Sequence, residues 1–354
     1  MDGTARLIRL VQFNQAKSDL PANTLFHAGP PYRGTPPEAV LTAAAQAAVI
    51  GEMAPDLDSA RAKISAGSIA LRPAQEFGLV APLAQVVAPS MWCLEVGNDQ
   101  YRAYSPVSEG PAPALRFGSD DAGCITRARD WCAALAAEIN PMLAKIAIEP
   151  EKMMQEALKA GDDCHARTLA GTNQFVDALP DLHPELRAEV LTNVGFSLGI
   201  WMAWCAWKLR TSGSPIVAIG GNGIEFGVKY EGDSEWKTTP APAPTGVLFA
   251  PEAAPLALGA IGDSAVVDAC GFGGQALRHA PTLVEEWEAH LPSDALSRHG
   301  LVIDPATGVI DPERITGHNL SPIINLAILN RNGAGMPIGR GFYCPPVTIF
   351  ATEN

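Results

Sequence analysis

The residues best suited by type and spacing to catalysis lie at positions 161–173, in the run GDDCHARTLAGTN. They follow a helix-forming stretch, and if the helix continues, Asp162 and His165 fall on the same side of it. A carboxylate one turn before an imidazole fixes its tautomer and raises its basicity, which suits proton transfer near neutral pH. Asp163 and Arg167 are four residues apart and are expected to form an ion pair. Arg167 is also a catalytic candidate, and we expect it to border a concave pocket together with Asp162 and His165. Spacing alone favours the alternative, a solvated, salt-bridged helix start with one structural histidine.

A second candidate segment is 261–274, IGDSAVVDACGFGG. Its glycines Gly271, Gly273 and Gly274 precede an expected helix from residue 275. Free backbone N–H groups at such a turn bind an anion, a phosphate or a developing oxyanion. The pattern matches neither GxGxxG nor the Walker sequence of nucleotide sites. The structural alternative is a tight turn that lets a helix pack closely against a sheet.

Two further residues of this segment, Asp263 and Cys270, are catalytic candidates. Asp263 lies directly before the apolar run. A thiol beside a helix N-terminus has a depressed pKa and becomes nucleophilic, which is the functional interpretation of Cys270. The burial habits of free cysteine favour the other interpretation, a small buried hydrophobe.

Five more residues are candidates for binding a substrate: His27, Arg116, Asn222, Glu225 and Arg340. His27 ends a short apolar run before a Gly-Pro turn, a position typical of a cleft and equally of a hydrogen bond to the backbone. The two arginines would bind a carboxylate at two points or brace a loop. The glycines around Arg340 favour a loop over the site. The Asn-Gly pair at 222–223 predicts a tight hairpin that would place Glu225 beside the pocket or in solvent.

Composition excludes several classes of protein. With 47% hydrophobic and 18% charged residues the chain is expected to fold, and its formal net charge of −13 argues against nucleic acid and anionic membranes as partners. Seven scattered cysteines without a C-x-x-C pair predict neither disulfides nor a zinc site and favour the cytoplasm. No metal or other cofactor is predicted. The apolar stretch 194–207 is shorter than the ~20 residues that span a membrane, so we expect a buried helix.

The order of elements predicts an α+β fold with two mixed α/β domains flanking a helical block. The expected N-terminal α+β domain covers residues 1–145, the helical domain 146–212 and the C-terminal α+β domain 213–354. Within the helical block, Trp201, Trp204 and Trp207 have a spacing more typical of a core than of a ligand cage.

Six stretches resemble, in the same order, the family that contains AllG (YlbE), a subunit of oxamate carbamoyltransferase. They are LFHAGPP at 25–31, LRFG at 115–118, GDDCHAR at 161–167, NGIEFGV at 222–228, the 261–274 segment and SPIINLAILNRNGAGMPIGRGFYCPP at 321–346. The resemblance covers nearly the whole chain from about residue 20. The family's fold implies the same three-part division.

The resemblance implies carbamoyl transfer, in which phosphate attacks the carbamoyl carbon of an oxalurate-like ureide and releases the amide and carbamoyl phosphate. It suggests amides of 271–274 for the phosphate, Asp162 with His165 for the proton, and Arg116 or Arg340 for a carboxylate. We expect these segments to converge on one concave pocket. A homo-oligomer and FdrA-like and YlbF-like partner subunits are also expected. Two alternatives stay open: hydrolysis of an amide or cyclic amide, and a non-catalytic scaffold.

Two departures from the family pattern put a simple transfer of roles in doubt. Relatives have histidines in the stretch that here reads PAQEFGLVAP at 73–82, and alanine is expected where this chain has Cys270. Loss of the histidines favours a changed substrate or chemistry.

Overall fold

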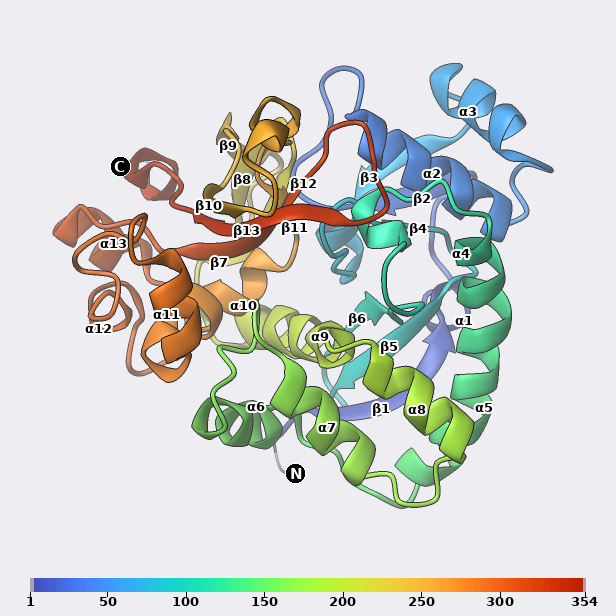
Figure 1. Ribbon diagram of the computed structural model, residues 1–354, viewed down its shortest axis with the longest axis horizontal. Helices are drawn as coiled ribbons and strands as arrows, with labels where there is room; N and C mark the ends of the chain where they lie inside the picture. Colours follow the sequence, from blue (N-terminus) through green and yellow to red (C-terminus); the bar gives the residue numbers. More distant parts are fainter. Residues whose placement is uncertain (1–2, 353–354) are drawn as a thin grey trace.

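The computed structural model describes residues 3–352 and has the predicted α+β fold (Figure 1). Its strands form three three-stranded sheets and one four-stranded sheet within that range, rather than one large sheet. Helix α9 (Phe196–Thr211) crosses the middle of the molecule, between the sheet that contains the N-terminal strand and the C-terminal sheets (Figure 1). The site described below lies beside this helix.

The N-terminal third contains two sheets. The first has the antiparallel order β1-β5-β6, and the second has the order β3-β2-β4, with β2 and β3 parallel. Their bounds are β1 (Arg6–Gln12), β2 (Thr24–His27), β3 (Ala70–Pro73), β4 (Val86–Val87), β5 (Trp92–Gly97) and β6 (Arg102–Pro106).

The helices of the first two thirds follow the predicted order. The alanine-rich helix α2 begins directly after Pro37, and its alanines, which have the highest helix propensity, are all buried. A π-helical stretch, 127–131, joins α4 to α5. The bounds are α1 (Phe13–Ala16), α2 (Glu38–Ile50), α3 (Leu57–Ser65), α4 (Gly123–Thr126), α5 (Cys132–Leu143), α6 (Pro150–Lys159), α7 (Leu169–Asp177) and α8 (Pro184–Thr192).

The last third contains the other two sheets, in the orders β11-β7-β8-β9 and β10-β13-β12, both antiparallel. The strands are β7 (Ile216–Asn222), β8 (Glu225–Tyr230), β9 (Lys237–Pro240), β10 (Thr245–Leu248), β11 (Ile261–Gly262), β12 (Ile324–Leu329) and β13 (Pro337–Tyr343). Short helices lie between them: α10 (Ala265–Ala269), α11 (Pro281–Trp287), α12 (His299–Val302) and α13 (Pro312–His318).

The predicted Asn-Gly hairpin is confirmed between β7 and β8. Gly223 has a φ of 86°, and Asn222 Oδ1 accepts hydrogen bonds from the N–H groups of Ile224 and Glu225. An asparagine side chain that bonds the backbone ahead of it stabilises such a turn without any ligand.

Helix α9 is buried on nearly every side. Trp201, Trp204 and Trp207 are at most 8% exposed and belong to the largest core, which confirms that they pack the interior. Among residues 3–352 no single helix is long and apolar enough to cross a membrane, although α8 and α9, bent by 76°, pass that test as a pair.

The division at residues 145 and 212 stays a prediction. The largest core contains side chains from all three expected domains, and a second core joins the N-terminal region to Leu258, Ile261 and Leu329. Helix α9 and the sheets on both sides of it therefore share one interior.

Three local predictions were wrong. Residues 160–168 form a loop between α6 and α7 rather than a continuous helix. The glycine turn leads into 3₁₀ turns at Gly273–Gln275 and Leu277–His279, not into an α-helix. Arg340 lies in β13, the central strand of its sheet, not in a mobile loop.

Candidate functional site

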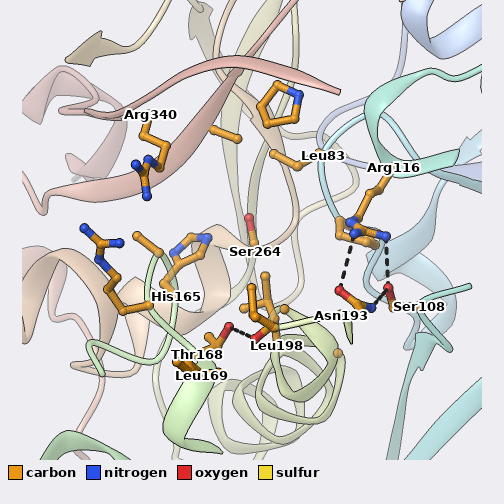
Figure 2. A pocket seen from close by; sticks show the side chains of 18 of the residues that line it. Leu83, Ser108, Arg116, His165, Thr168, Leu169, Asn193, Leu198, Ser264 and Arg340 are labelled. Atoms are coloured by element: carbon orange, nitrogen blue, oxygen red, sulfur yellow. Dashed lines mark hydrogen bonds between the residues drawn. The ribbon is translucent and has the colours of Figure 1, made fainter. Parts of the chain in front are cut away.

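A pocket of about 820 Å³ opens between helices α7 and α9 on one side and strands β12 and β13 on the other. The 160–168 loop, the 82–83 turn, the 106–117 segment and residues 192–195 also line it, together with Phe249, Ser264 and Thr282. Five charged or titratable residues line it: Arg116, Asp162, His165, Arg167 and Arg340. The prediction that Asp162, His165 and Arg167 border a concave pocket is therefore confirmed, and Figure 2 shows His165, Arg340 and Arg116 around the same space.

His165 forms a buried pair with Asp268, one residue that the predictions had not singled out. Its Nδ1 lies 2.8 Å from Asp268 Oδ2, and the two side chains are 5% and 0% exposed. Asp268 Oδ1 accepts hydrogen bonds from the N–H groups of Gly274 and Asn325. Burial lowers the pKa of His165, but attraction to the Asp268 carboxylate and their hydrogen bond outweigh it and raise the pKa overall. Since Asp268 holds Nδ1, Nε2 is the ring nitrogen left for a ligand.

Asp162 caps a helix instead of orienting His165. Its Oδ2 accepts a hydrogen bond from the N–H of Gly171, in the first turn of α7. Burial raises the pKa of Asp162, and hydrogen bonds from the start of α7 oppose that rise. The predicted Asp162–His165 pair is wrong, because the segment turns as a loop and presents Asp162 to the next helix.

Asp163 stabilises the same loop. Its carboxylate accepts hydrogen bonds from the backbone N–H groups of residues 165–167 and from Asn325 Nδ2. The expected ion pair with the Arg167 side chain is absent from the contacts of the described chain, since the guanidinium turns to a different carboxylate. Asp163 thereby fixes the backbone that carries His165.

Arg167 and Arg340 share the carboxylate of Glu286 at one end of the pocket. Arg167 Nη2 lies 2.8 Å from one oxygen of Glu286, and Arg340 Nε lies 3.2 Å from the other. Arg340 also stacks over the ring of Phe249, with 5.5 Å between the guanidinium carbon and the ring centroid. Two cations share one anion, so this end retains positive charge and suits an anionic ligand.

Arg116 occupies the other end of the pocket (Figure 2). Its side chain is only 14% exposed. Its guanidinium donates hydrogen bonds to Ser108 Oγ, to the carbonyl of Gly110 and to Asn193 Oδ1, and the buried Glu109 carboxylate lies 3.9 Å away. These contacts hold the planar group in one orientation. A fixed guanidinium suits two-point binding of a carboxylate.

The glycine turn does not offer free amides. Gly271 N–H donates to the backbone carbonyl of Asp268, Gly273 N–H to that of Asp163 at 2.7 Å, and Gly274 N–H to Asp268 Oδ1 at 2.7 Å. A Cβ atom on Gly274 would lie 2.2 Å from the carbonyl oxygen of Ile323. The predicted anion cradle is therefore wrong, and the structural interpretation holds: the glycines allow close packing around Asp268.

Asp263 is fully buried, one residue before the pocket-lining Ser264. Its carboxylate accepts hydrogen bonds from Gly29 N–H, Ala81 N–H and Gln75 Nε2. Burial raises its pKa to about 7 against the effect of these donors. Asp263 thus joins three chain segments behind the pocket. Gln75, in the 73–82 stretch, belongs to this buried network rather than to the pocket wall.

Cys270 is 5% exposed, and its Sγ lies 3.4 Å from the carbonyl oxygen of Cys205. It follows the last residue of α10, so no helix N-terminus faces it. The physical argument for an activated thiol therefore fails, and the small-hydrophobe interpretation describes its surroundings.

His27, Asn222 and Glu225 do not line the pocket in the described chain. His27 is 1% exposed, its Nδ1 lies 2.8 Å from the carbonyl oxygen of Ala28, and burial lowers its pKa to about 4. Glu225 accepts a hydrogen bond from Thr238 Oγ1 across β8 and β9. The expectation that this hairpin borders the pocket is wrong. The Glu225 side chain bonds to the neighbouring strand β9, and neither Asn222 nor Glu225 belongs to the pocket lining of the described chain.

The structure adds four residues to the site: Asp268, Ser264, Asn193 and Glu286. The first two lie inside the predicted 261–274 segment, and their four-residue spacing was the available signal. The other two lie in stretches without any pattern. Within residues 3–352, no group of three or more histidine, cysteine or acidic side chains has metal-binding geometry.

Comparisons with known proteins assign the chain to a family. Residues 69–264 match the family described as "Oxamate carbamoyltransferase subunit AllG", and the chain belongs to that family. It is 31% identical to the uncharacterized protein YahG of Escherichia coli K12, over 96% of this chain and 80% of YahG. It is 27% identical to the oxamate carbamoyltransferase subunit AllG of the same organism, over 92% and 87%. A conserved Enterococcus faecalis V583 protein of unknown function has the same fold, with a TM-score of 0.86 and 26% identity, over 98% of this chain and 92% of that one.

Proposed function

We propose that this chain binds a small ureide of the oxalurate type and inorganic phosphate in the pocket, and transfers the carbamoyl group to phosphate. The observation that carries the proposal is the arrangement of arginines at both ends of one cavity with the His165–Asp268 pair on its wall. An oxalurate-like ureide has a carboxylate at one end and a carbamoyl group at the other. The name of the relative AllG describes a subunit of an oxamate carbamoyltransferase, which supports this class of reaction.

The two ends take different anions in this proposal. Arg116, held by Ser108 and Asn193, binds the ureide carboxylate. Arg167 and Arg340, whose combined charge exceeds that of Glu286, bind phosphate. The ureide's carbamoyl carbon then lies toward the phosphate, and the pocket holds the reactants in line.

Proton transfer belongs to His165. As a phosphate oxygen forms a bond to the carbamoyl carbon, the carbon–nitrogen bond breaks and the leaving nitrogen needs a proton. His165 Nε2 supplies that proton and recovers one from the phosphate hydroxyl, so that one proton moves overall from phosphate to the released amide. Asp268 keeps Nδ1–H as a donor and stabilises the imidazolium form, in line with the raised pKa of His165.

The test measures the purified chain with oxalurate, with and without phosphate, by following carbamoyl phosphate and oxamate. We expect phosphate-dependent turnover that Arg340→Gln weakens through the KM for phosphate and Arg116→Gln through the KM for the ureide. Arg187→Gln, at an exposed ion pair with Asp177, is the control and should behave as the wild type.

The alternatives predict different results. Equal turnover without phosphate would favour hydrolysis and contradict the transfer. Turnover only after addition of other proteins would assign the chain to a larger assembly, as the word subunit in the relative's name suggests. The proposal would be refuted if the chain neither turned over the ureide nor bound either anion.

A further inference from the structure

One group that carbamoyl transfer requires is still missing from the site. When phosphate attacks, negative charge develops on the carbamoyl oxygen, and a hydrogen-bond donor aimed at that oxygen lowers the barrier. The predicted donors were the N–H groups of residues 271–274, and those of Gly271, Gly273 and Gly274 are all occupied. The donor must therefore come from another residue of the pocket wall.

Ser264 is a buried hydroxyl group without a partner. The residue is 1% exposed and lines the pocket, and its Oγ forms no hydrogen bond with any residue of the described chain. Leaving a buried hydroxyl unpaired costs about 1–3 kcal/mol. A ligand that accepts a hydrogen bond from Ser264 removes this cost when it binds.

The surroundings of Ser264 fix its direction. The preceding Asp263 is anchored to three segments, and a Cβ atom on Gly262 would lie 2.9 Å from Leu83 N and 3.0 Å from Ser264 Oγ. Leu83 itself has a φ of 49°, a left-handed conformation that is strained for a leucine and is found at functional sites. Leu83 therefore closes the hydroxyl on this side, and Ser264 borders the pocket on the other side.

Ser264 also lies at the centre of the proposed reaction. It precedes Asp268 by four residues across the single turn of α10, so both lie on the same side of that turn, and Asp268 holds His165. Figure 2 shows Ser264 between Arg116 on one side and His165 with Arg340 on the other. A ligand whose charged ends meet the two arginine groups would present its middle to this hydroxyl.

We propose that Ser264 Oγ–H donates a hydrogen bond to the carbamoyl oxygen of the ureide during transfer. This inference rests on the proposed function, which supplies the ligand class. As the new carbon–oxygen bond forms, the carbonyl π electrons move onto the oxygen that Ser264 holds. They return when the carbon–nitrogen bond breaks and His165 protonates the nitrogen. No covalent bond forms to Ser264, and the hydroxyl keeps its proton.

The experiment compares Ser264→Ala with Ser105→Ala. Ser105 is a matched control, because it is also a buried serine without a hydrogen-bond partner in the described chain, but it lies outside the pocket lining. Ser264→Ala should lower kcat by about 10²–10³-fold, as loss of one such donor does. The KM values should be unchanged, and the thermal midpoint should not fall, because each alanine variant removes an unpaired buried hydroxyl. Ser105→Ala should keep the wild-type kcat and KM. Ser264→Cys, a weak donor, should give an intermediate kcat.

The outcomes separate this inference from the proposed function. Wild-type protein that neither binds the ureide nor turns it over with phosphate overturns both. An active wild type with a normal kcat in Ser264→Ala overturns the role of Ser264 alone. A raised KM at normal kcat also overturns it, because the contact would then serve binding and not the transition state. An added carbamoyl group in intact mass spectra of quenched wild-type reactions, absent from Ser264→Ala, would overturn the inference and make Ser264 a nucleophile.

Discussion

Replacing Asp268 by asparagine is the sharpest test of the proton relay, because the structure fixes what the new amide must do. Asp268 Oδ1 accepts two backbone N–H bonds, from Gly274 at 2.7 Å and Asn325 at 3.1 Å. An asparagine keeps its oxygen on that side and points its NH₂ group at His165 Nδ1. The imidazole must then accept at Nδ1 and carry its proton on Nε2. The nitrogen facing the reactants loses its ability to take up a proton.

The expected loss is that of general acid–base catalysis, about 10²–10⁴-fold in kcat. This corresponds to roughly 3–5.5 kcal/mol of transition-state stabilisation, at about 1.4 kcal/mol for each factor of ten. The loss of stability should be much smaller, about 1 kcal/mol, because the two backbone hydrogen bonds survive and one charged bond becomes neutral. The assay is a pH–rate profile of ureide phosphorolysis beside a denaturation curve.

The same variant should change how stability depends on pH. The folded pKa of His165 is raised, so the stability that its pair with Asp268 contributes is fully present below the unfolded value of about 6.5 and is lost as pH rises through the folded value. Asp268→Asn should flatten this decline. Near-normal kcat in the folded variant, with an unchanged pH–rate profile, would refute the relay. His165→Asn, whose amide nitrogen can replace Nδ1 beside Asp268, is the companion variant and should fold and be inactive.

Three further predictions concern residues around the site. Asp263→Asn should lower the free energy of unfolding by about 1–3 kcal/mol, because the new NH₂ group cannot accept the hydrogen bonds of the three donors and leaves at least one of them unpaired. An unchanged denaturation midpoint would contradict this. Gly274→Ala should lower the thermal midpoint, since its Cβ would lie 2.2 Å from the Ile323 carbonyl oxygen. A wild-type thermal midpoint would contradict this. Cys270→Ala should retain ureide turnover, because the buried thiol lies outside the pocket lining; loss of turnover at unchanged stability would restore a catalytic thiol.

The regular elements were predictable where local chemistry determines them. The alanine-rich helix after Pro37 and the β7–β8 hairpin around Asn222 depend on propensity and turn geometry within a few residues. The loop at 160–168 was not predictable in this way, because its residues are individually compatible with a helix. There Asp163 collects three backbone N–H groups, and Asp162 caps the following helix. Such side-chain bonds compete with helix formation, and a periodicity argument does not weigh them.

The site was predictable in its segments but not in its pairs. The Asp162–His165 spacing drew attention to the correct histidine and the wrong carboxylate, since its partner Asp268 is 103 positions away. The glycine turn was recognised, but the acceptors that occupy its N–H groups are oxygens of Asp163 and Asp268. Which buried carboxylate meets which donor depends on the long-range packing of α10 against the 160–168 loop, and a single sequence carries little information about it.

The distribution of charge explains how an acidic protein can bind two anions. The chain has a formal net charge of −13, yet the pocket is lined by three arginines, one carboxylate and His165. That carboxylate, Asp162, caps α7. At physiological ionic strength, charges more than about 8 Å apart across solvent are largely screened, whereas partly buried charges close to a ligand are not. The local arginines therefore determine what binds in the pocket. Raising the salt concentration should weaken phosphate binding at the half-exposed Arg340 end more than carboxylate binding at the buried Arg116, and equal weakening at both ends would contradict this assignment.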